Sequence, residues 1–202
     1  MSRAVLSSPA LRSIVPCALL FALTAAPAAA QAPRRGGLWA DAGVGYGRFR
    51  LTCTTCASVA AAGGTEVTIT VGGAPTANVL LGVQAQAWSS SGSGTSQQVR
   101  SLTAIVQWYP WPAGGLFVRA GTGVVQGPVA PRTDGVQPAT IQGTGVGLDF
   151  GVGYDLPVSE HFGVTVQAAT HIAALGDLLV NGQVANDVIA YVARLGVAIV
   201  LR

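Results

Sequence analysis

The sequence predicts an all-β fold in which eight antiparallel strands close into an up-and-down transmembrane β-barrel. Three observations support this prediction. Apolar and polar residues alternate in eight separate segments, long and short connections alternate between these segments, and hydrophobicity is high without any long apolar run. Half of the chain is hydrophobic and only 9% is charged, which is little charge for the surface of a water-soluble domain. A barrel in lipid resolves this conflict because it exposes its apolar residues at alternate positions of many short strands.

Residues 1–30 have the three-part layout of a secretory signal peptide and are expected to be cleaved before the barrel forms. Two arginines supply a basic start, residues 14–26 are almost wholly apolar, and three consecutive alanines precede the expected cleavage site. The apolar stretch is too short for a membrane-spanning helix, which needs about 20 residues. Residues 31–202 are then expected to form one outer-membrane β-barrel domain.

The charge pattern of the expected mature chain excludes other classes of protein. It has nine arginines, no lysine and eight acidic residues, a net charge of +1. Without a basic cluster, the chain lacks the positively charged surface that nucleic-acid binding requires. No segment reaches 18 consecutive apolar residues, which argues against a helical membrane protein.

Each predicted strand shows a period of two, which places its apolar residues on one face of a sheet. The clearest segment has Val, Leu, Phe, Val and Tyr at even positions from 146 to 154, against glycine or aspartate at the odd positions. The shortest has Val67, Ile69 and Val71 against Glu66 and two threonines. In chain order, the eight segments cover residues 38–47, 66–71, 79–88, 101–109, 116–124, 145–155, 162–171 and 189–202.

The connections between these segments alternate in length. Four long connections are predicted at 52–65, 89–97, 127–143 and 173–186. Three short ones are predicted at 73–78, 110–115 and 157–161. Outer-membrane barrels have long loops outside and tight turns on the periplasmic side, so this pattern predicts N- and C-termini in the periplasm.

Aromatic residues gather near the short turns, where rings can lie in the membrane interface. They are Trp39, Trp108, Tyr109, Trp111, Tyr154 and Phe162. We interpret them as an aromatic girdle, with ordinary packing near strand ends as the alternative.

Three glycine-rich stretches carry a resemblance to a known family. They are Gly37-Leu-Trp-Ala-Asp-Ala-Gly-Val-Gly-Tyr46, Leu102-Thr-Ala-Ile-Val-Gln-Trp-Tyr-Pro110 and Gly145-Val-Gly-Leu-Asp-Phe-Gly-Val-Gly-Tyr-Asp155. With them, the chain resembles the small bacterial outer-membrane β-barrel proteins of the OmpA-like, OmpX-like and OmpW-like group. The resemblance implies a location in the Gram-negative outer membrane, contact with its lipid, and insertion by the barrel-assembly machinery. It implies a fold rather than an activity, and we expect a monomer.

Four charged residues fall on the inward faces of the predicted strands: Asp41, Arg119, Asp149 and Arg194. The lumen of an eight-stranded barrel is about wide enough for side chains to fill it. Because buried charges need partners, we predict that the two arginines are matched by the two aspartates in one interior network. A structural plug is the favoured interpretation, and an ion-conducting polar path is the alternative. The inward glycines suit either tight packing or a narrow water-filled space.

Cys53 and Cys56 lie in the first predicted long loop. Export through an oxidising compartment favours a disulfide that closes this loop. Free or redox-active thiols are an alternative. Zinc would need two further ligands, and both histidines lie far along the chain.

The sequence contains no recognisable catalytic constellation and predicts no cofactor or metal. We therefore expect an outer-membrane barrel with a structural or surface-interaction role, and not an enzyme. Two alternatives stay open: a narrow porin-like channel for small solutes, and a lipid-modifying enzyme that would use His171. A soluble periplasmic β-sandwich would be a different class altogether.

Overall fold

The computed structural model describes residues 36–52, 61–92, 95–127, 143–180 and 183–202. The expected signal peptide at 1–30 lies outside these residues. The described part includes no helix that is long and apolar enough to cross a membrane. Its eight strands are β1 (Gly37–Thr52), β2 (Ala62–Thr76), β3 (Val79–Gly92), β4 (Thr95–Trp108), β5 (Leu116–Gln126), β6 (Thr144–Pro157), β7 (Phe162–Val180) and β8 (Gln183–Leu201).

The strands form a closed antiparallel barrel, which confirms the predicted fold class. Each strand pairs with its neighbour in the chain, and β1 pairs with β8 to complete the circle. The β1–β8 pairing runs from Ala40 opposite Leu201 to Thr52 opposite Ile189. Closure removes the free sheet edges, and it lets strands cross a membrane because every backbone polar group can pair internally.

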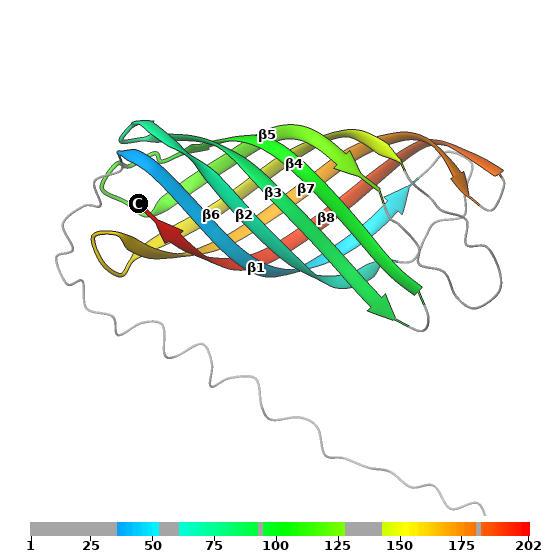
Figure 1. The fold of residues 1–202 in the computed structure, drawn as a ribbon, viewed down its shortest axis with the longest axis horizontal. Helices are drawn as coiled ribbons and strands as arrows, with labels where there is room; N and C mark the ends of the chain where they lie inside the picture. Colours follow the sequence, from blue (N-terminus) through cyan, green and yellow to red (C-terminus); the bar gives the residue numbers. More distant parts are fainter. Residues whose placement is uncertain (1–35, 53–60, 93–94, 128–142, 181–182) are drawn as a thin grey trace, which may run out of the picture. The chain divides into compact units, whose positions relative to one another are not determined.

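Figure 1 shows the strands wound obliquely around the barrel, with the start of β1 and the end of β8 at the same end. The three short connections, β2–β3, β4–β5 and β6–β7, lie at this end and occupy residues 77–78, 109–115 and 158–161. We call it the turn end. The opposite end is the loop end.

Two of the four predicted long loops are wrong in extent, because strand pairing continues through most of them. At 89–97, β3 and β4 stay paired as far as Gly92 opposite Thr95. At 173–186, β7 and β8 stay paired as far as Val180 opposite Gln183. Residues 89–92 are Ser-Ser-Ser-Gly, a composition without apolar–polar contrast, so the sequence predicts a loop where the strands remain paired. In β7 the register also shifts around Gly176, whose φ is +69°.

The outer face of the barrel is a continuous apolar band. Val44, Ile69, Leu102 and Val152 are each about half exposed, although all four lie inside regular strands. Such a surface is far larger than the apolar patches that water-soluble monomers expose. The band therefore fits a lipid environment, as the alternation predicts.

Not all of the predicted girdle residues face outward. Trp108, Trp111, Tyr154 and Phe162 are exposed around the turn end, but Trp39 and Tyr109 are buried inside the barrel. Adjacent residues of a strand point to opposite faces, so two consecutive aromatic residues near a strand end do not both reach lipid. The girdle interpretation is wrong for these two residues.

The lumen holds two apolar clusters. The turn-side cluster consists of Trp39, Leu80, Ile105, Tyr109 and Phe117. The loop-side cluster consists of Phe49, Leu51, Trp88, Val99, Val125, Ala173, Leu175, Val188, Ala190 and Val192.

Trp88 anchors the loop-side cluster. It is fully buried, its ring centroid lies 5.1 Å from that of Phe49, and its indole nitrogen donates to the Gly47 carbonyl oxygen at 3.2 Å. An indole held by both stacking and a hydrogen bond has a defined orientation. The two clusters therefore place packed aromatic side chains toward both ends of the lumen.

Candidate functional site

A belt of buried polar side chains lies between the two apolar clusters and is the candidate functional site. On β1, for example, Asp41 follows the turn-side Trp39 and precedes the loop-side Phe49. Inward positions alternate with lipid-facing ones, so each strand can contribute polar groups to the belt without exposing them to lipid. The belt consists mainly of Asp41, Glu66, Thr68, Thr70, Gln84, Gln86, Ser101, Thr103, Gln107, Arg119, Asp149, Gln167, His171 and Arg194.

Arg194 of β8 forms the most connected group of contacts. Its Nη1 lies 2.8 Å from Glu66 Oε1, and its Nη2 lies 2.9 Å from Asp149 Oδ2. Nη2 also lies 3.4 Å from Gln84 Oε1, and the Gln84 amide donates to Thr70 Oγ1 at 3.3 Å. One guanidinium thus joins two carboxylates from β2 and β6 across the lumen. Charge-assisted hydrogen bonds of this kind are the stronger ones in proteins.

His171 of β7 borders the same group. Its Nδ1 lies 3.5 Å from Asp149 Oδ2, and the side chain is 2% exposed. Its ring is packed against Gly147, where an added Cβ would stand 2.5 Å from Nε2. The histidine is therefore an interior packing and polar group at this position.

Arg119 of β5 forms a second group. Its Nε and Nη2 donate to Gln107 Oε1 at 3.0 and 2.7 Å, and Nη2 lies 3.6 Å from Asp41 Oδ2. The guanidinium carbon stands 5.6 Å from the centroid of the Phe117 ring, a cation–π distance. Arg119 consequently links the polar belt to the turn-side cluster.

Asp155 of β6 organises a third group at the turn end. Tyr109 donates its hydroxyl to Asp155 Oδ2 at 2.6 Å, and Thr165 donates to the other carboxylate oxygen. Arg202, directly after β8, forms an ion pair with the same carboxylate. Gln107 contacts both the Tyr109 hydroxyl and Arg119, so the second and third groups are continuous.

The structure brings the four predicted residues together in pairs. Arg119 lies beside Asp41, and Arg194 lies beside Asp149, with all four side chains buried. Sequence reasoning did not include Glu66, although its alternation with Val67 already placed it on an inward face.

Asp155, Tyr109 and Arg202 were also left out of the predicted network. Asp155 lies on the same inward face of its predicted strand as Asp149, so the alternation could have placed it in the lumen. Tyr109 was assigned to the girdle instead. Alternation also placed Arg202 on the same face as Arg194, but it did not indicate the partner, which comes from another strand.

Inward glycines make room for the large interior side chains. An added Cβ would stand 2.3 Å from the Phe117 ring at Gly153, and 2.7 Å from the Trp88 ring at Gly64. Both distances are far below ordinary contact, so each glycine is a recess filled by an aromatic ring. At these positions the structure favours tight packing over open space.

The described residues contain no cluster of His, Cys, Asp and Glu that could hold a metal ion. Cys53 and Cys56 lie outside the described residues, so the predicted disulfide stays a prediction. Within the described part, the polar belt pairs its charged groups with one another, while several of its buried polar atoms, among them both His171 ring nitrogens and Arg119 Nη1, have no hydrogen-bond partner. Its geometry suits structural support of a narrow lumen.

The fold and this filled interior define the class: the chain has the fold of the small outer-membrane β-barrels. No protein-family model and no curated protein matches its sequence. Neisserial surface protein A (NspA) is a solved structure that matches with a TM-score of 0.53 and 15% identity, covering 80% of this chain and 96% of that one. Ail, the attachment invasion locus protein of Yersinia pestis, matches with a TM-score of 0.50 and 10% identity, covering 82% and 99%. At such identities the likeness concerns the fold alone.

Proposed function

We propose that the protein is an outer-membrane β-barrel with a structural or surface-interaction role, whose lumen does not conduct. The observation that carries this proposal is the filled interior. Aromatic clusters occupy both ends of the lumen, and ion-paired arginines occupy the belt between them. A solute path would have to break buried ion pairs, and leaving one charge unpaired in a protein interior is strongly unfavourable.

The apolar outer band and the fold of known outer-membrane neighbours support location in the outer membrane. In the proposed orientation the turn end, with both ends of the described barrel, faces the periplasm. The loop end then faces outward, as in barrels with short periplasmic turns. Lipid and the barrel-assembly machinery are the partners that this location requires, and we propose a monomer.

We further propose that the protein is not an enzyme. A lipid-modifying role would need a base that reaches lipid together with a nucleophile. His171 is instead enclosed in the lumen beside Asp149, which supports a packing role. A narrow channel is the second candidate, and only the polar character of the belt favours it.

Current through planar bilayers that contain the refolded mature protein tests this proposal. We expect no stepwise conductance under conditions in which a general porin gives clear steps. Heat-dependent electrophoretic mobility on the same sample establishes that the barrel has folded. Reproducible unitary currents from folded protein would overturn the plugged-barrel proposal in favour of the channel.

A further inference from the structure

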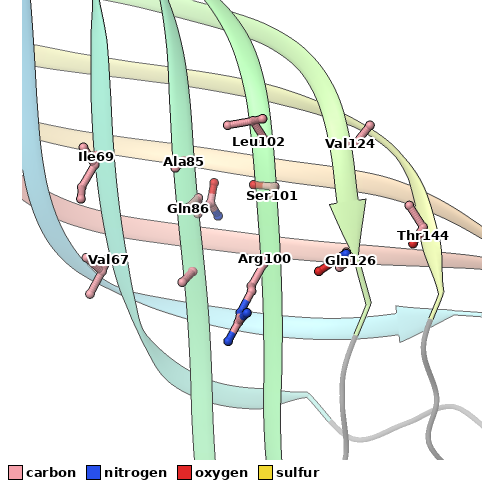
Figure 2. Close-up of a pocket in the computed structure, with 11 residues that line it drawn as sticks. Val67, Ile69, Ala85, Gln86, Arg100, Ser101, Leu102, Val124, Gln126 and Thr144 are labelled. Carbon is pink, nitrogen blue, oxygen red and sulfur yellow. The ribbon is translucent and has the colours of Figure 1, made fainter.

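The outer face of the barrel carries an apolar groove of about 480 Å³ over β3, close to the loop end. Its floor is formed by Ala85 and Ala87, two small outward residues on successive outward positions of β3. Figure 2 shows Val67 and Ile69 on the β2 side of this floor and Leu102 on the β4 side. In the pairing register, Ala85 stands between Ile69 and Leu102, so larger side chains flank a small one.

The loop-end side of the groove is polar. Arg100 lies opposite Ala87 in the register, Gln126 lies opposite Arg100, and Thr144 lies opposite Gln126. All three line the groove and are exposed. Among the described residues Arg100 makes no ion pair, and its Nη2 donates to Gln98 Oε1 at 3.0 Å. This exposed cation therefore has donors left for an anionic ligand.

We infer that this groove binds one membrane lipid with a net anionic phosphate headgroup, with an acyl chain over Ala85 and Ala87 and the phosphate on Arg100. The groove opens on the apolar band, so an acyl chain is the occupant that its surroundings supply. Arginine matches phosphate in geometry as well as charge, and Gln126 adds a neutral donor beside it. The inference rests on the proposed membrane location. A folded barrel that does not retain the lipid would overturn the inference while leaving the location intact.

Native mass spectrometry of the detergent-folded protein, titrated with phosphatidylglycerol or phosphatidylcholine of identical chains, tests the site. We expect one phosphatidylglycerol to bind in preference to phosphatidylcholine. Arg100→Gln should weaken phosphatidylglycerol binding about tenfold, as expected for loss of a charge-assisted contact. Ala85→Leu with Ala87→Leu, which fills the floor, should weaken binding of both lipids.

Arg50→Gln is the matched control, because Arg50 is another exposed strand arginine but does not line the groove. An equal loss in Arg50→Gln and Arg100→Gln would show general charge attraction and overturn the site. Unchanged binding in the double leucine variant would overturn the acyl-chain groove. Displacement of the lipid by inorganic phosphate alone would reduce the site to an anion contact and overturn it as a lipid site. Heat-dependent mobility of each variant verifies that the barrel remains folded.

Discussion

Arg194 and Glu66 are 128 positions apart in the chain, yet Arg194 Nη1 lies 2.8 Å from Glu66 Oε1 inside the barrel. Arg194 belongs to β8 and Glu66 to β2, and β1 lies between these strands. The contact therefore spans the strand that closes the barrel. Arg194 reaches Asp149 on β6 as well, so one side chain connects three strands that are not direct neighbours.

Arg194→Met should destabilise the barrel by about 3–5 kcal/mol, because it leaves Glu66 and Asp149 buried without their cation. Urea unfolding in lipid vesicles, followed by tryptophan fluorescence, measures this loss. Arg50→Met, on the exposed outer face, is the control and should change stability by at most about 0.5 kcal/mol. Adding Glu66→Gln to Arg194→Met should recover part of the loss, because one of the two unpaired charges is removed. Equal stability of the two arginine variants would contradict the assigned role.

Tyr109→Phe should cost about 1–3 kcal/mol, since it removes the hydroxyl that donates to the buried Asp155 carboxylate at 2.6 Å. The same unfolding assay applies. Tyr154→Phe serves as the comparison because Tyr154 is 49% exposed on the outer face. If Tyr109→Phe and Asp155→Asn proved strictly additive in a double-mutant cycle, the two side chains would not be coupled as described.

Gly153→Ala should destabilise the barrel by about 1–3 kcal/mol through overpacking. The new Cβ would stand 2.3 Å from the Phe117 ring and 2.8 Å from the Val166 carbonyl oxygen. Gly73→Ala is the matched control, because the nearest atom to its Cβ is the Gly37 carbonyl oxygen at 3.7 Å. Combining Gly153→Ala with Phe117→Leu should cost less than the sum of the single changes. A tolerated Gly153→Ala would show that the ring has room to move.

Cys53 and Cys56 are predicted to form a disulfide in the exported protein. Alkylation of the purified, unreduced mature chain, followed by mass spectrometry, should find neither thiol modified. Reduction before alkylation should then label both. Labelling without reductant would favour the alternative of free thiols.

Much of the barrel could be predicted from local sequence. Period-two alternation is a property of strand geometry. It therefore identified eight strands and showed that Asp41 and Asp149 face inward, without information on which strands pair. It failed at the loop end, in the hairpin of β3 with β4 and in that of β7 with β8. There residues 89–92 are Ser-Ser-Ser-Gly, which carry no apolar–polar contrast, and the β7–β8 register shifts around Gly176.

Only the closed tertiary structure decided which inward groups meet. Alternation shows that Glu66, Asp149 and Arg194 face the lumen, but not that one guanidinium lies between both carboxylates. It also left Arg202 without its partner Asp155. These contacts depend on the register of several strands and on side-chain reach across a narrow lumen. Both are non-local quantities, and neither is encoded in the period of any single strand.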